Sequence, residues 1–162
     1  MSASFTLRRY VEADLDAVLR VFRDSVGTLA AEHYDADQRA AWQSAADDGA
    51  AFGARFDGLS MLVAERDGEI VGFAGRAGNL IDFLFVAPQA ARTGIASALY
   101  AALEAEALDA GEDMLTTEAS HAARSFFEGQ GFTFVRENRR ERNGVVLTNN
   151  TMTKPLAQKV PA

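Results

Sequence analysis

The stretch from residue 81 to residue 108 constrains the fold more than any other part of the chain. It opens on the apolar run Phe83-Leu84-Phe85-Val86, whose aromatic and β-branched residues favour a strand buried on both faces. Pro88 cannot donate a hydrogen bond to a sheet, so the strand is predicted to end there. After a turn of small residues, helical spacing is kept by Ile95, Ala98, Leu99, Ala102 and Leu103. Strand, turn and helix in this order direct unpaired N–H groups and the positive end of a helix dipole at one point, which predicts a phosphate site.

The composition is that of one globular domain and excludes several functional classes. The chain has 162 residues, 48% of them apolar, and a net charge of −7. We expect one domain over residues 1–156 and a short tail at 157–162. An acidic chain argues against nucleic-acid and membrane surfaces, which need a basic excess. The sequence holds no cysteine, which excludes disulfides, thiolate metal sites and a cysteine nucleophile. The N-terminus lacks the apolar core of a secretion signal, so a cytoplasmic protein is expected.

The remaining patterns predict alternating strands and helices. Asp14 is expected to cap the first helix, and Asp35 with Gln38 resembles a capping box at the start of the second. The tight-turn sequences Asp67-Gly68 and Asn143-Gly144 each predict a hairpin. The predicted strands are 5–10, 61–66, 69–77, 81–86, 114–118, 132–140 and 145–153, and the predicted helices are 15–29, 36–46, 95–110 and 122–130, with a loosely helical segment at 48–58. The strand–helix–strand order across 81–118 predicts a parallel pair at the middle of the sheet.

Two segments resemble signature motifs of the GNAT (GCN5-related) N-acetyltransferase superfamily. Residues 86–96 resemble its strand end V-x-P and loop Q/R-x-x-G-x-G/A, with Ala91 where the family has Gln or Arg. Residues 120–132 resemble its second signature, N-x-x-A-x-x-L/F-Y-x-x-x-G-F, with Ser120 for the asparagine and Phe127 for the tyrosine. Within the superfamily, residues 32–34 and 126–128 are among those similar to a bacterial subgroup, the YafP-type acetyltransferases.

This resemblance implies the GNAT fold. That fold is an α+β domain of three layers, in which helices flank a central mixed, mostly antiparallel sheet of about seven strands with one parallel pair. The resemblance also implies an N-acetyltransferase, an acyltransferase that moves an acetyl group from acetyl-CoA to a primary amine. The expected acceptor is a small molecule or a peptide, attacking directly in a ternary complex. Many members of the family form dimers, and the sequence does not decide whether this protein forms a homodimer.

The resemblance assigns a set of residues to coenzyme A. Pantetheine is expected to pair like an extra strand with the backbone of Leu84, Phe85 and Val86, where an N–H would also meet the developing oxyanion. Pyrophosphate is expected on the backbone amides of Arg92, Thr93, Gly94, Ile95, Ala96 and Ser97. The side chain of Arg92 either adds a phosphate contact or is a solvated surface arginine. Ser120 would bond the cofactor, serve as a helix N-cap, or do both. Phe127 takes the position near the departing sulfur.

Four residues are candidates for proton transfer. Asp82, in an otherwise apolar strand, and Glu118, at the end of the neighbouring strand, are candidate bases because a carboxylate there is expensive to bury without a partner. For both carboxylates the alternative is a salt bridge or a strand-end residue that reaches solvent. His33 is a further candidate base, with packing as its alternative. Tyr34 is the candidate acid in place of Phe127, or it only shapes the pocket. Two distant histidines without a supporting cluster predict no metal site.

Two alternatives to an active acetyltransferase stay open. Ala91 and Phe127 also suit a catalytically impaired acyl-CoA-binding or regulatory module of the same fold. The Gly94 turn taken alone also suits an unrelated α+β domain that binds another phosphate ligand. The acceptor itself is weakly indicated, because the acidic residues Glu32, Asp35 and Asp37 near its expected entrance favour a cationic amine.

Overall fold

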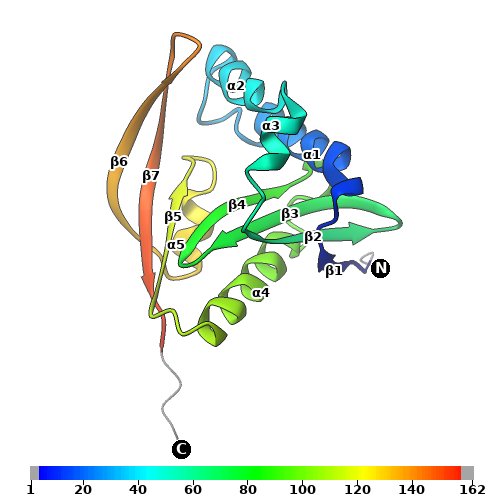
Figure 1. The fold of residues 1–162 in the computed structure, drawn as a ribbon. Helices are drawn as coiled ribbons and strands as arrows, with labels where there is room; N and C mark the ends of the chain where they lie inside the picture. The colour runs from blue at the N-terminus through cyan, green and yellow to red at the C-terminus, as the bar shows by residue number, and fades with distance from the viewer. Residues whose placement is uncertain (1–3, 158–162) are drawn as a thin grey trace, which may run out of the picture.

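The computed structural model describes residues 4–157, which form one seven-stranded sheet with helices on both faces (Figure 1). The strand order is β1-β2-β3-β4-β5-β7-β6, and every pair is antiparallel except β4 with β5. The strands are β1 Thr6–Arg9, β2 Ser60–Arg66, β3 Glu69–Ala77, β4 Leu80–Val86, β5 Met114–Ala119, β6 Thr133–Arg142 and β7 Val145–Pro155. The predicted mixed sheet and its parallel pair are confirmed. Of the predicted tail at 157–162, residues 158–162 lie outside the described residues.

Helices cover the two faces of the sheet and give the three predicted layers (Figure 1). The helices are α1 Leu15–Leu29, α2 Ala36–Gln43, α3 Gly49–Ala54, α4 Ile95–Asp109 and α5 Arg124–Gly129, with short 3-10 segments η1 Glu12–Asp14, η2 Ser44–Ala46 and η3 Pro88–Ala90. Both α1 and α4 pack against β3 and β4. A Cβ at Gly72 would lie 3.1 Å from Ile95 and 3.2 Å from Leu99, so this glycine lets β3 approach α4 closely.

The opposite face of β3 and β4 carries the aromatic part of the core. Phe73 is fully buried, and its ring stacks on Phe85 with centroids 5.4 Å apart. Phe22 of α1 meets Phe85 at 5.1 Å and Phe52 of α3 at 4.9 Å. These rings fix α1 and α3 over the centre of the sheet, as the alternation of side chains along a strand requires.

The central strand differs from its predicted burial. Ile81 and Phe83 are buried, but Asp82 is exposed, and the run from Leu84 to Val86 is only half-buried. The prediction that this strand is buried on both faces is therefore wrong for its second half. The reason is that the second half of β4 borders a groove.

Both predicted hairpin turns are present. Asp67 and Gly68 have φ of 53° and 78°, and Asn143 and Gly144 have φ of 51° and 76°. Two consecutive left-handed residues are the geometry that a two-residue hairpin turn needs, and Asn, Asp and Gly reach it most easily. The capping box of Asp35 and Gln38 is also confirmed, with hydrogen bonds of 2.8 and 2.9 Å.

Two predicted helix caps differ in detail. The Asp14 carboxylate does not cap α1, because it accepts hydrogen bonds from the Val11 amide at 2.9 Å and from Arg8 at 2.8 and 2.9 Å. Ser120 accepts from the amide of Ala123 at 3.1 Å and so caps a turn, after which α5 begins at Arg124 rather than at residue 122.

Asp14 should make the stability of the protein depend on pH in the acid range. Its hydrogen bonds from Arg8 lower the pKa of this carboxyl below the ordinary value of 3.8. The pair therefore stabilises the fold above that value, and the contribution is lost as the pH falls through it toward the lower pKa of the folded state. We expect Asp14→Asn to lower the free energy of unfolding at pH 7 by about 1.5–3 kcal/mol and to flatten its fall between about pH 5 and 3.

Urea unfolding at several pH values measures this effect. The exposed Asp24 of α1 provides a matched control, since Asp24→Asn removes a carboxylate from the same helix without touching Arg8. Equal acid limbs in wild type and Asp14→Asn would contradict the assignment.

Candidate active site

The central feature of the site is the separation of β4 and β5. These parallel strands are paired only at Leu80 with Thr116 and at Ile81 with Thr117. The Thr117 hydroxyl donates to the carbonyl oxygen of Ile81 at 3.0 Å and strengthens this last pair. Beyond it the register shows no further β4–β5 pair, although both strands continue. The sheet is therefore open between the second halves of β4 and β5.

A cavity of about 580 Å³ lies on one side of this opening and is called here the cofactor groove. Its walls come from the second half of β4, the turn before α4, the C-terminal half of α1 and the residues around α5. They include the predicted Leu84, Phe85, Val86, Arg92, Gly94, Ala96, Ser97 and Ser120. Phe126 of α5 also lines the groove, and sequence reasoning missed it.

The turn before α4 is shaped to bind an anion. Arg92 and Gly94 have φ of 62° and 87°, and the Thr93 hydroxyl donates to the carbonyl oxygen of Ala90 at 2.5 Å. Within residues 4–157, no backbone carbonyl accepts from the amides of residues 92–97. Left-handed residues turn successive amides toward a common point, and the start of the 15-residue α4 adds its dipole there. This site therefore fits a pyrophosphate group.

Three of the predicted cofactor residues do not present their side chains to the groove. Thr93 bonds within the turn, and Ile95 is 1% exposed in the core, so only their amides are available. Phe127 is 3% exposed and packs its ring against Phe132 at 5.1 Å, away from the groove. Consecutive helical residues point about 100° apart, so with Phe127 in the core it is Phe126 that faces the groove.

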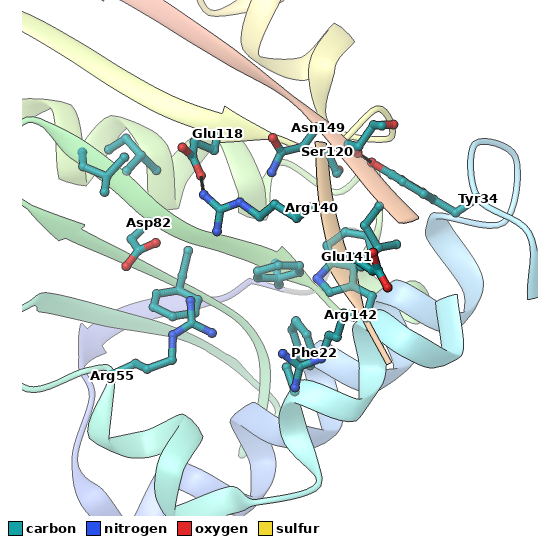
Figure 2. A pocket seen from close by; sticks show the side chains of 18 residues that line it. Phe22, Tyr34, Arg55, Asp82, Glu118, Ser120, Arg140, Glu141, Arg142 and Asn149 are labelled. Carbon is teal, nitrogen blue, oxygen red and sulfur yellow. Dashed lines mark hydrogen bonds and ion pairs between the residues drawn. The ribbon is translucent and has the colours of Figure 1, made fainter. Parts of the chain in front are cut away.

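A second cavity, of about 330 Å³, lies across the opening and is called here the acceptor cavity (Figure 2). Most of its apolar wall is aromatic and comes from Phe22, Tyr34, Trp42, Phe83 and Phe85. Its polar side chains come mainly from β4, β5 and the β6–β7 hairpin. The two cavities share Trp42, Phe85 and Ser120, so they meet at the gap between the strands.

Asp82 and Glu118 both line the acceptor cavity, each one residue beyond the last β4–β5 pair (Figure 2). The Glu118 carboxylate accepts a hydrogen bond of 2.8 Å from Arg140, which is the salt bridge that the sequence left as its alternative role. In the described part of the chain, Asp82 has no hydrogen-bond or ion-pair partner. Glu141, the third carboxylate of the cavity, lies near the tip of the β6–β7 hairpin, so Asp82 is the unpaired carboxylate beside the gap between β4 and β5.

The Tyr34 hydroxyl is already engaged in the structure. It donates to the carbonyl oxygen of Thr148 at 2.7 Å and accepts from the amide of His121 at 3.0 Å. Burial raises the pKa of Tyr34 above its ordinary value of 10. Its ring lines the acceptor cavity, but its proton is committed to Thr148. The predicted alternative role, shaping the pocket, fits this arrangement better than proton donation.

The two histidines have different surroundings from those expected. His33 is exposed and lines the cofactor groove, not the acceptor cavity. His121, for which the sequence suggested no role, stacks on Tyr34 with centroids 5.4 Å apart. The Asn150 amide donates to His121 Nδ1 at 2.9 Å, so Nε2 carries the proton of the neutral ring and donates to Thr148 Oγ1 at 2.6 Å. These contacts tie the residues after β5 to β7.

Two further structural findings bear on other kinds of site. No group of three or more His, Cys, Asp or Glu side chains placed to hold a metal ion occurs among residues 4–157. In the same part of the chain, no helix has the length and apolar character that crossing a membrane requires.

Comparison with known proteins agrees with this geometry. The family model described as an acetyltransferase (GNAT) domain matches residues 30–154. The N-acetyltransferase YafP of Escherichia coli (strain K12) is 34% identical over 143 residues, 88% of this chain and 91% of that protein. The crystal structure of a GCN5-related N-acetyltransferase from Rhodopseudomonas palustris is 38% identical and superposes with a TM-score of 0.91, covering 96% of this chain and 99% of that chain.

A more distant structure carries the ligand that the groove fits. The PaiA N-acetyltransferase of Thermoplasma acidophilum, in complex with coenzyme A, superposes with a TM-score of 0.76 at 17% identity, over 94% of this chain and 99% of that chain. At this identity the likeness shows a shared fold. Free amides at the start of α4, a groove along β4 and the family match together lead to one conclusion: the chain belongs to the GNAT acetyltransferase family and is an acyltransferase whose co-substrate is acetyl-CoA.

Proposed function

We propose that the protein transfers the acetyl group of acetyl-CoA directly to a primary amine of a small molecule or peptide, with both reactants bound at once. The observation that carries this proposal is the shared wall of the two cavities, formed by Trp42, Phe85 and Ser120. Because the cavities meet at the gap that these three residues line, a reactant bound in one cavity can reach a reactant bound in the other. Direct transfer therefore needs no carrier on the protein.

The side chains near the gap support direct transfer over a covalent intermediate. The chain has no cysteine, and the Ser120 hydroxyl accepts from the amide of Ala123. Within the described residues no side-chain base is hydrogen-bonded to Ser120, so nothing activates it as a nucleophile.

The cofactor groove would bind acetyl-CoA through its backbone and small residues. We assign the pyrophosphate to the amides of residues 92–97, with the guanidinium of Arg92 at the exposed rim. The half-buried run from Leu84 to Val86 would accompany the pantetheine arm, and the Ser120 hydroxyl borders both cavities. The bound co-substrate supplies an activated acetyl thioester. Its sulfur leaves as a thiolate, since the pKa of a free thiol is about 8.5, so no strong acid is required.

Asp82 is assigned as the group that accepts the proton of the attacking amine. A primary alkylammonium has a pKa of about 10.4 and cannot attack until it loses a proton. Asp82 faces the acceptor cavity without a described partner, whereas Glu118 is held by Arg140. We therefore give Glu118 a positioning role through Arg140. His33, which lines the cofactor groove, receives no part in proton transfer.

One observation favours a second candidate, a GNAT module that binds acetyl-CoA without efficient transfer. Phe127 cannot donate a proton and lies in the core, and the Tyr34 hydroxyl bonds to Thr148. The acceptor cavity thus lacks an evident acid. The experiment below separates this candidate from the first.

Steady-state kinetics with varied concentrations of acetyl-CoA and a primary amine test the proposal. We expect amine-stimulated release of the free thiol, with double-reciprocal lines that intersect. Intact mass spectrometry after incubation with acetyl-CoA alone should show an unmodified chain. Parallel lines together with an acetylated chain would instead indicate a covalent carrier. Binding of acetyl-CoA without stimulation by any amine would support the impaired module.

A further inference from the structure

The acceptor cavity contains an arginine whose charge is unmatched. Arg55, at the end of α3, holds its guanidinium 4.7 Å from the ring centre of Phe83 and 5.5 Å from that of Phe52. Among residues 4–157 it has no hydrogen-bond acceptor and no carboxylate at ion-pairing distance. Stacking on a ring leaves the N–H edge of a guanidinium available, and that edge matches a carboxylate. Arg55 therefore offers a place for an anionic group of the acceptor.

Asp82 provides the complementary charge. Figure 2 shows Asp82 and Arg55 reaching into the same cavity from β4 and from the end of α3. Their charged groups are too far apart to form an ion pair with each other, so each is open to a ligand. A ligand that carries both an ammonium and a carboxylate satisfies the two groups together.

The acceptor cavity has as many positively charged as negatively charged side chains. The cavity is lined by the arginines Arg55, Arg140 and Arg142 and by the acidic residues Asp82, Glu118 and Glu141. Arg140 pairs with Glu118, and Arg142 donates through Nε to the Ser44 hydroxyl at 3.0 Å. Glu141 has no hydrogen-bond or ion-pair partner among the described residues and lies near the hairpin tip. A lining with as many positive as negative side chains favours a ligand without net charge over a polycation or polyanion.

This balance changes the expectation from the sequence. The three acidic residues thought to attract a cationic amine do not line the acceptor cavity. Glu32 lines the cofactor groove, and the Asp35 carboxylate caps α2. Asp37 is exposed in the first turn of α2.

The β6–β7 hairpin closes one side of the acceptor cavity. Asn143 and Arg142 both donate to the Ser44 hydroxyl at 3.0 Å, Gln38 donates to the carbonyl oxygen of Val146 at 3.2 Å, and Tyr34 donates to that of Thr148. Figure 1 shows the tip of this hairpin beside α2. These bonds are called here the hairpin clasp. A polypeptide cannot lie across the cavity where the clasp joins the two sides.

The size and lining of the cavity restrict the body of the ligand. Its volume of about 330 Å³ is at the small end of ligand sites, and aromatic rings form most of its apolar wall. An apolar or aromatic group of amino-acid size can pack there, whereas a longer chain cannot be enclosed.

We infer that the acceptor is a small amphoteric amine, an α-amino acid with an apolar side chain, whose amine faces Asp82 and whose carboxylate binds Arg55. This inference rests on the proposed acetyl transfer to amines and narrows it to one substrate class. It excludes polyamines and internal positions of a polypeptide as preferred acceptors.

Four acceptors test the inference: L-phenylalanine, phenethylamine, putrescine and the tripeptide Phe-Ala-Ala. Phenethylamine lacks only the carboxylate of phenylalanine. We expect kcat/KM to be about 10–100-fold higher for phenylalanine than for phenethylamine, as loss of a hydrogen bond to a charged group implies. Arg55→Gln should lower kcat/KM for phenylalanine by a similar factor, mainly through KM, and change kcat/KM for phenethylamine by a much smaller factor.

Arg139→Gln is the matched control, because Arg139 is an exposed arginine of β6 that lines neither cavity. This variant should leave kcat/KM unchanged for both phenylalanine and phenethylamine. Phenethylamine, putrescine or the tripeptide serving as well as phenylalanine would overturn the inference, and so would an equal effect of Arg55→Gln on both monoamines. In those cases acetyl transfer to an amine would still stand. Acetylation of none of the four, with acetyl-CoA bound, would overturn the inference alone, and amine-stimulated release of the free thiol would then decide the proposed function separately.

Discussion

Replacing Ala96 by glutamate is expected to weaken acetyl-CoA binding by about 10²–10⁴-fold, as judged from the loss of two charge-assisted hydrogen bonds. Ala96 lies in the first turn of α4 and lines the cofactor groove beside the free amides. A carboxylate there occupies and repels the space that a pyrophosphate would take. The same carboxylate is favourable for the helix, since a negative side chain near an N-terminus interacts well with the dipole. The change should therefore remove binding without unfolding the chain.

Calorimetric titration with acetyl-CoA measures this loss. Ala101→Glu is the control, because Ala101 is exposed further along the same helix and lines neither cavity. It adds the same charge and should bind normally. Gly94 is a poorer position for such a test, because its φ of 87° strains any side chain. Normal binding by Ala96→Glu would show that the phosphate does not bind at the start of α4.

Asp82→Asn is expected to lower kcat/KM for an amine acceptor by about 10²–10⁴-fold, the usual contribution of a positioned base. An asparagine keeps the shape of the side chain but cannot take a proton from the ammonium. The deficit should shrink as the pH rises, because a growing fraction of the amine is then already neutral in solution. Binding of acetyl-CoA should be unchanged, since Asp82 does not line the cofactor groove.

Glu118→Gln is the informative comparison for this variant. The Glu118 carboxylate is engaged by Arg140, so its loss should reduce the rate by less than about 10-fold, the range of an exposed ion pair. Initial rates of both variants from pH 6 to 9 would separate the two carboxylates. A larger effect at Glu118 than at Asp82 would reverse the assignment of the base.

Local sequence signals predicted the elements and the phosphate-binding turn. Asp67-Gly68 and Asn143-Gly144 specify their turns through residues that are adjacent in the chain, and Gly94 before an alanine-rich helix does the same. Each of these features depends on a few consecutive residues. Backbone preference therefore makes them predictable from the local sequence alone.

The contents of the acceptor cavity could not be predicted in this way. The hydrogen bond from Tyr34 to Thr148 joins residues 114 positions apart, and nothing beside Tyr34 in the chain reveals it. Likewise, Arg55 reads as an ordinary residue at the end of a short helix until α3 is packed on β4. The choice between Phe126 and Phe127 depended on which of the two adjacent rings packs into the core against Tyr100 and Phe132, and the motif does not show that tertiary contact. Consecutive helical residues point about 100° apart, so burying Phe127 leaves Phe126 at the groove.

The meeting of two cavities at one gap in the sheet also has a consequence for product release. The spent thiol would form in the cofactor groove and the acetylated amine in the acceptor cavity. Trp42, Phe85 and Ser120 line the junction between the two. Each cavity opens to the surface along its own set of residues, so neither product has to pass the other on its way out. Departure can therefore follow either order, and a tightly held thiol would slow the next turnover without trapping the acetylated product.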